Sequence, residues 1–242
     1  MRLWDPITRR QVGEPLTGYH TDTVTSVAFG VGVDDRLWLA SGSSDETVRL
    51  WGPITRRQVG APLTGHTDTV ASVGFGVDAA GRLLLASGSH DQTVRVWDPI
   101  TGQPVGSPLT GHTSAVASVV FGVRADGRPL LASGSHDGTV RVWDPMTGRQ
   151  VGSPLTGHTE EVVSVAFGVD ADDRLWFASG SYDETVRLWD PLTGRQVGAP
   201  MTGHTDTVSS VGFGIDADGR LLLAGSADQI HIRAFTRAQR HE

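Results

Sequence analysis

Apolar and polar residues alternate with a period of two along most of the chain, and no segment shows the apolar stripe of an amphipathic helix. β-Branched and aromatic residues gather in runs of about six residues, separated by turn-forming Gly, Asp and Pro. In residues 70–109 this pattern predicts four short strands. Their sequences are VASVGF, LLLASGS, TVRVW and QPVGSPL, and the turns between them include DAAGR, SHDQT and DPITGQ.

The same block of strands and turns recurs along the chain. A Trp at the end of the third predicted strand stands at positions 4, 51, 97, 143 and 189, so successive copies lie 47, 46, 46 and 46 residues apart. The longer interval contains an extra residue, Tyr19. We expect a single domain of five units at about 17–63, 64–109, 110–155, 156–201 and 202–235, preceded by a partial unit at residues 1–16.

A four-stranded unit with two apolar faces cannot bury both alone, so it needs a neighbour on each side. Two architectures meet this need: a β-propeller, with blades around an axis, and a stacked β-solenoid. Proline cannot donate to a sheet ladder, which places the fourth strand of each unit at an outer edge. The first strand is small and apolar, which suits a crowded axis. The pattern therefore predicts an all-β propeller of four-stranded antiparallel blades.

Four residue types recur in fixed register: a His before the first strand, a Ser in the second strand, an Asp in the next turn and the terminal Trp. In these residues the chain resembles the WD-repeat β-propeller family, in its highly repetitive bacterial form, over nearly its whole length. The resemblance implies that the four residues form a hydrogen-bonded network inside each blade. The sets are His20–Ser41–Asp45–Trp51, His66–Ser87–Asp91–Trp97, His112–Ser133–Asp137–Trp143 and His158–Ser179–Asp183–Trp189, with only His204 and Asp228 left in the fifth unit.

A Ser, a His and an Asp in each unit also suggest a hydrolytic triad. We favour the structural interpretation, because a triad is one exposed constellation with its own oxyanion hole, and no G-x-S-x-G turn is present. The histidines lie in successive units and cannot converge on one metal ion. The loops at Asp170–Asp172 and Asp216–Asp218 lack the distal ligands of a calcium loop. We therefore expect no catalytic residues, no cofactor and no metal.

Composition narrows the function further. The chain contains no Cys and no Lys, which excludes disulfides, thiolate zinc sites and lysine-based phosphate or Schiff-base chemistry. A net charge of −7 argues against binding to nucleic acid or to membranes. No apolar stretch is long enough for a membrane helix and no signal peptide is evident, so we expect a cytoplasmic protein. Four repeated arginines are interpreted as solvated or ion-paired strand residues: Arg49, Arg95, Arg141 and Arg187.

Because the units are nearly identical, their differences carry the information on specificity. In the family that the chain resembles, partners usually bind the end of the ring formed by the Gly-His loops and the turns before the Asp. The bulky or ionisable residues there are His90, His136, Tyr182 and Glu161, our candidates for a partner surface. The expected function is a non-catalytic scaffold that binds a protein or peptide.

Two other functions stay open. The chain could be the C-terminal sensor or regulatory part of a larger signalling protein, such as an ATPase or a kinase. Less favoured is a small-ligand binder or an enzyme that uses the central channel, where the sequence offers only small residues such as Ser26, Ser72, Ser118, Ser164 and Ser210.

Five units leave two interpretations of ring closure. In the one we favour, the strand at residues 11–16 completes the last blade after Phe235 and closes a five-bladed ring. In the other, the chain belongs to a longer array, or several chains self-associate to complete a larger ring.

Overall fold

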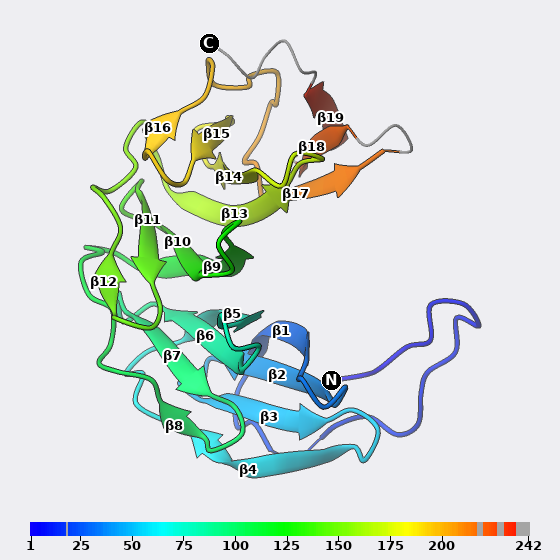
Figure 1. Ribbon diagram of the computed structural model, residues 1–242. Coiled ribbons are helices and arrows are strands. Elements are labelled where there is room, and N and C mark those ends of the chain that lie inside the picture. Colours follow the sequence, from blue (N-terminus) through cyan, green and yellow to red (C-terminus); the bar gives the residue numbers. More distant parts are fainter. Residues whose placement is uncertain (18, 217–219, 227–229, 236–242) are drawn as a thin grey trace.

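A computed structural model describes residues 1–17, 19–216, 220–226 and 230–235. Within these residues the regular structure is entirely β, and no helix occurs that could cross a membrane. The strands form five antiparallel sheets, one for each repeated unit, which confirms the predicted architecture. The sheets follow one another along an open arc (Figure 1).

In every sheet the strands are adjacent in chain order, and the last sheet has three strands where the others have four. The first sheet contains β1 (Val24–Val31), β2 (Leu37–Ser43), β3 (Val48–Gly52) and β4 (Arg57–Leu63). The second contains β5 (Val70–Val77), β6 (Leu83–Ser89), β7 (Val94–Asp98) and β8 (Gln103–Pro104). The third contains β9 (Val116–Val123), β10 (Pro129–Ser135), β11 (Val140–Asp144) and β12 (Arg149–Gln150). The fourth contains β13 (Val162–Val169), β14 (Leu175–Ser181), β15 (Val186–Asp190) and β16 (Arg195–Gln196), and the fifth contains β17 (Ser210–Ile215), β18 (Leu221–Ser226) and β19 (Ile230–Phe235).

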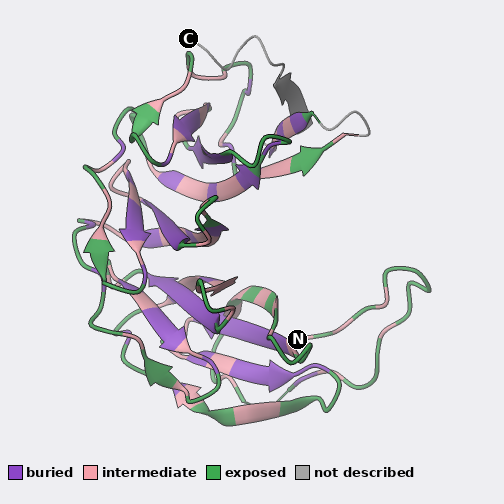
Figure 2. Ribbon diagram, in the orientation of Figure 1, coloured by how far each residue is buried: buried purple, intermediate pink, exposed green. Residues whose placement is uncertain are grey.

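The second strands form the centre of the apolar core. All seven residues of β6, of β10 and of β14 are buried, as the continuous purple of these strands in Figure 2 shows. A strand that is buried on both faces requires a sheet on either side. The core is accordingly made between sheets, for example where Leu63 of β4 packs in one cluster with Leu83 and Trp97 of the second sheet.

The first strands of consecutive sheets pack against one another at the inner side of the arc. Gly30, Gly76, Gly122 and Gly168 each face the Phe of the next sheet, and a methyl group added there would lie 2.3–2.7 Å from the Phe ring. Beside each such contact, a first-strand Ser accepts a hydrogen bond from a Val amide of the next sheet, as Ser72 Oγ does from Val119 at 3.1 Å. These inner serines therefore join sheets, and they do not form a polar channel.

The outer strand differs from the prediction in three of the four complete sheets. Residues 103–109 form only the two-residue β8 and an isolated bridge between Val94 and Leu109. The interruption falls at Gly106, whose φ is +76°, but Gly60 has a φ of +70° at the same place within the continuous β4, so the conformation of this glycine does not explain the difference. Only β4 runs through the whole predicted segment.

The predicted closing pairing at residues 11–16 is wrong. This segment pairs with the start of the chain, through the Trp4–Gln11 bridge and hydrogen bonds between Met1 and Leu16. Leu16, with Met1 and Leu3, packs on Leu39 and Trp51 of the first sheet. Residues 1–16 thus take the place of the third and fourth strands of a blade before β1, and the five-bladed ring is not closed.

Candidate functional site

The third sheet illustrates the repeated polar network. His112 lies in the loop before β9, Ser133 in β10, Asp137 in the following turn and Trp143 in β11. The His112 Nδ1 lies 2.8 Å from Asp137 Oδ2, and its Nε2 lies 2.8 Å from Ser133 Oγ. The Trp143 indole donates to the same hydroxyl at 2.9 Å. The network links the second and third strands, β10 and β11, to the loop that precedes β9.

The same four residues come together in the first, second and fourth sheets. His Nδ1 lies 2.7–2.8 Å from the Asp carboxylate and His Nε2 lies 2.7–2.8 Å from the Ser hydroxyl in each of them. The Trp indole donates to the Ser hydroxyl at 2.8–2.9 Å. The sets are those that the resemblance implies. In the fifth unit His204 is buried, while Asp228 lies outside the described residues.

Two further residue types complete each network, and the sequence analysis missed both. Thr139 donates from its hydroxyl to Asp137 Oδ1 at 2.6 Å, and Ser135 accepts from the Asp137 amide at 3.1 Å. Equivalent residues stand in the other three units, Ser two positions before the Asp and Thr two positions after it. Their fixed spacing from the Asp was the signal that could have found them.

The hydrogen-bond chain orients each histidine as a neutral ring. Its Nδ1–H donates to the Asp, and its Nε2 accepts from the Ser hydroxyl, which in turn accepts from the Trp. Burial lowers the pKa of His20, His66 and His158 below the ordinary 6.5, although the neighbouring carboxylate opposes this effect. A neutral imidazole is therefore the form that the fold favours.

The aspartates stay ionised because the hydrogen bonds that their carboxylates accept outweigh the effect of burial. Burial alone would raise the pKa of Asp45, but hydrogen bonds from Thr47, His20 and backbone amides outweigh burial and hold that pKa well below its usual range. The same balance lowers the pKa of Asp91, Asp137 and Asp183.

The geometry of the network suits a structural role. Ser133 is completely buried, and its hydroxyl already bonds both Trp143 and His112. A nucleophile needs an exposed oxygen beside a reacting group, and these buried serines leave no space for a substrate.

The four repeated arginines are held by hydrogen bonds, in contrast to the predicted solvated or ion-paired state. Arg141 donates to Gln150 Oε1 at 2.6 Å, and Arg49 and Arg187 bond the equivalent glutamines. Arg95 faces Pro104 in place of a glutamine and bonds the Gly65 carbonyl instead. The Nε of each Arg is buried without a hydrogen-bond partner among the described residues.

Three candidate partner residues, His90, His136 and Tyr182, lie in the turns between second and third strands, and Glu161 lies in the loop just before β13. The His136 Nδ1 is 3.4 Å from Glu161 Oε2, and the His90 and His136 rings are 6.1 Å apart. Tyr182 projects from the turn of the fourth sheet and is 45% exposed. The structure thus brings these four side chains along one edge of the second, third and fourth sheets. We call His90, His136, Glu161 and Tyr182 the rim surface.

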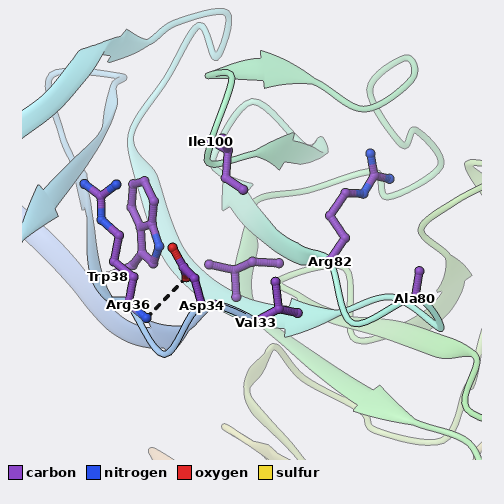
Figure 3. A pocket seen from close by; sticks show the side chains of 9 residues that line it. Val33, Asp34, Arg36, Trp38, Ala80, Arg82 and Ile100 are labelled. Atoms are coloured by element: carbon purple, nitrogen blue, oxygen red, sulfur yellow. Dashed lines mark hydrogen bonds between the residues drawn. The ribbon is translucent and has the colours of Figure 1, made fainter.

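A shallow cavity of about 290 Å³ lies at the opposite end of the strands, between the first two sheets (Figure 3). It is lined by Val33, Asp34, Arg36, Trp38 and Ile100, among others. Gly32 stands there where the fourth sheet has Asp170, which accepts a hydrogen bond from the Trp176 indole at 2.9 Å.

Comparison with protein-family models gives five matches, all to the WD domain, G-beta repeat. The matched residues are 13–52, 57–98, 102–144, 148–190 and 195–230. Comparison with curated proteins gives no match. Each of the first four matched segments contains one complete His–Ser–Asp–Trp network and the fifth contains His204, so that sequence and geometry agree unit by unit. The chain belongs to the WD-repeat family.

Proposed function

We propose that this protein is a non-catalytic, cytoplasmic scaffold that binds a protein or peptide partner at the rim surface. The observation that carries the proposal is the alignment of the most variable bulky residues of the repeats along one edge of three consecutive sheets. Repeats of this family generally mediate protein–protein interaction. In the first four units the same backbone hydrogen bond supports the rim turn, so the units differ there in their side chains.

The rim has the rigidity that a docking platform needs. The amides of His90, His136 and Tyr182 each donate to a carbonyl of the loop before the first strand, at 2.9–3.0 Å. The peptide backbone is thereby fixed on both sides of each turn. Because the backbone of the rim is already fixed, binding of a partner immobilises few additional groups of this protein, which reduces the entropic cost of association.

The chemistry of the rim favours a partner that offers both hydrogen bonds and an apolar or aromatic group. Tyr182 presents a half-exposed ring with a hydroxyl, and tyrosine is enriched among residues that dominate binding energy. The two imidazoles can donate and accept hydrogen bonds, and Glu161 can accept them.

The experiment is affinity capture from a lysate of the source organism with the intact chain and two triple variants. His90→Ala, His136→Ala and Tyr182→Ala together should abolish capture of a specific partner. The control combines Ile100→Ala, Met146→Ala and Leu192→Ala, which are exposed in the turns at the other end of the strands. Equal capture by the rim variant and the intact chain would refute the proposal.

A further inference from the structure

Every interface between consecutive sheets repeats the same inner contact. A Phe of the later sheet sits over a Gly of the earlier one, as Phe75 does over Gly30 and Phe213 over Gly168. A Val amide of the later sheet donates to a Ser of the earlier one, at 3.0 Å from Val211 to Ser164. The earlier sheet supplies a slot and an acceptor, and the later sheet supplies an apolar side chain and a donor.

The first sheet presents the apolar half of this contact to solvent. Val27 and Val31 are each 54% exposed and Phe29 is 55% exposed, whereas the Val that corresponds to Val27 in the other sheets is only 5–8% exposed. These three residues point away from the second sheet, on the face of β1 where an earlier sheet would lie. We call Val27, Phe29 and Val31 the leading face.

The fifth sheet presents the other half. Gly214 corresponds to Gly168, but a methyl group added at Gly214 would meet none of the described residues within 4 Å. Ser210 corresponds to Ser164 and is exposed. We call the open side of β17 with Ser210, Gly212 and Gly214 the trailing face. Leading and trailing faces thus carry complementary halves of one interface that the chain builds four times internally.

We propose that the leading face of one copy binds the trailing face of a second copy. Phe29 enters the slot over Gly214, and the Val27 amide donates to Ser210 Oγ, as the equivalent groups do inside the chain. The contact is heterologous, so each bound copy keeps one free face and association continues until a ring closes or a longer assembly forms.

The outer strands limit the strength of this association. Residues 1–16 occupy the place of the third and fourth strands of a sheet before β1. In the second copy, β19 is the third strand of the fifth sheet, so on docking it would occupy the same space as residues 1–16 of the first copy. One of these two segments must move aside on docking, and we therefore expect a weak association that depends on protein concentration.

Sedimentation velocity over increasing concentration of the full chain tests the proposal. The intact protein should associate, while Phe29→Ala and Gly214→Leu should each stay monomeric at concentrations where the intact protein has associated. Phe29→Ala keeps the trailing face and Gly214→Leu keeps the leading face, so their equimolar mixture should form dimers and nothing larger. Both positions are exposed, and equal thermal unfolding of the variants confirms that they fold.

The matched control is Leu192→Ala, which removes an apolar side chain of the same 55% exposure as Phe29 from a turn outside both faces. It should associate like the intact chain. The rim triple variant should also associate normally, so that self-association and partner binding at the rim surface can be tested independently. An intact protein that stays monomeric, variants that associate normally, or a mixture of folded variants that remains monomeric would each overturn it.

Discussion

Each network depends on one serine hydroxyl that serves two neighbours. Ser133 Oγ accepts from the Trp143 indole and lies 2.8 Å from His112 Nε2, with no exposed surface on the serine. Loss of Ser133 would leave both the Trp143 indole and His112 Nε2 without their partner. An unpaired buried polar atom lowers the free energy of unfolding by more than the hydrogen bond itself contributes, because water cannot reach the site to replace the lost partner.

We expect His112→Ala to lower the free energy of unfolding by about 1–3 kcal/mol, since it leaves Ser133 and Asp137 without their shared partner. Chemical denaturation measures the change. His136→Ala is the control, because this histidine lies on the rim and its contact with Glu161 is 3.4 Å long. An unchanged midpoint for His112→Ala would contradict a structural role of the network.

Stability should fall as the pH is lowered, in two stages. The pKa of His20, His66 and His158 is lowered in the folded protein, so the unfolded chain binds protons first and stability declines once the pH drops below about 6.5. The pKa of Asp45, Asp91, Asp137 and Asp183 is also lowered, so a second loss begins below the ordinary value of 3.8. Denaturation curves at a series of pH values measure both losses. Stability that stayed level from neutral pH to the ordinary pKa of aspartate would disprove the first stage.

The residues of the networks were accessible from sequence because a repeat shows which positions never vary between units. The arginine environment was not accessible in the same way. Alternation along the third strand places Arg141 on a strand face, but the bond to Gln150 depends on how the outer strand returns beside it. That return is a tertiary feature with no local pattern.

At the scale of the strand, a small residue in one sheet makes room for a large one in the next. Gly76 in β5 lies so close to Phe121 in β9 that a Cβ would be 2.3 Å from the ring. Packed interiors tolerate such additions poorly, because the ring is held by its other neighbours.

Gly76→Ala should therefore lower the free energy of unfolding by about 1–3 kcal/mol, the usual cost of overpacking. Gly214→Ala places the same methyl group at the equivalent position of the last sheet, where no described residue lies within 4 Å, and should leave stability unchanged. Thermal unfolding of the two variants under identical conditions makes the comparison. Equal losses in both would show that backbone flexibility, and not the Phe contact, governs these positions.

The three inner strands of each unit follow from the period of two and from the turn residues, and the structure has them where the pattern predicts. The fourth strand does not follow so simply. Its sequence alternates as a strand should, yet β8 ends after two residues while β4 continues through Gly60, a glycine with the same left-handed φ as Gly106. A glycine can extend a strand or break it, and the alternation pattern does not distinguish these outcomes.

At the scale of the whole molecule, stability should decrease toward the ends of the arc. A sheet in the middle is packed on two faces, whereas the fifth sheet has a neighbour only on the side of β13 and β14. In a repeat protein each unit is stabilised by its own contacts and by those with its nearest neighbours. The units are therefore unequal although their sequences are nearly equal.

Hydrogen exchange of the native protein should show this gradient. Amides of β10 should exchange slowest, and those of β18 should exchange distinctly faster, since local opening is easier where fewer apolar contacts are lost. Mass spectrometry of peptides from the two strands provides the measurement. Equal protection in β10 and β18 would imply one cooperative body and would contradict the gradient.

The open arc itself was beyond sequence reasoning. Strand alternation shows that two neighbours are needed for each unit, but it does not set the angle between sheets, which depends on tertiary contacts such as that of Phe75 with Gly30. Leu16 could in principle have joined either end of the array. Its packing on Leu39 and Trp51 places residues 1–16 beside the first sheet, and no local sequence pattern encodes this contact.

The repeated Gly–Phe register has a consequence for how such a chain can change over generations. Because all four junctions use the same contact at the same spacing, removing or duplicating one whole module in the gene joins surfaces that already match. The length of the array can therefore drift by recombination between near-identical copies while each surviving junction keeps its fit.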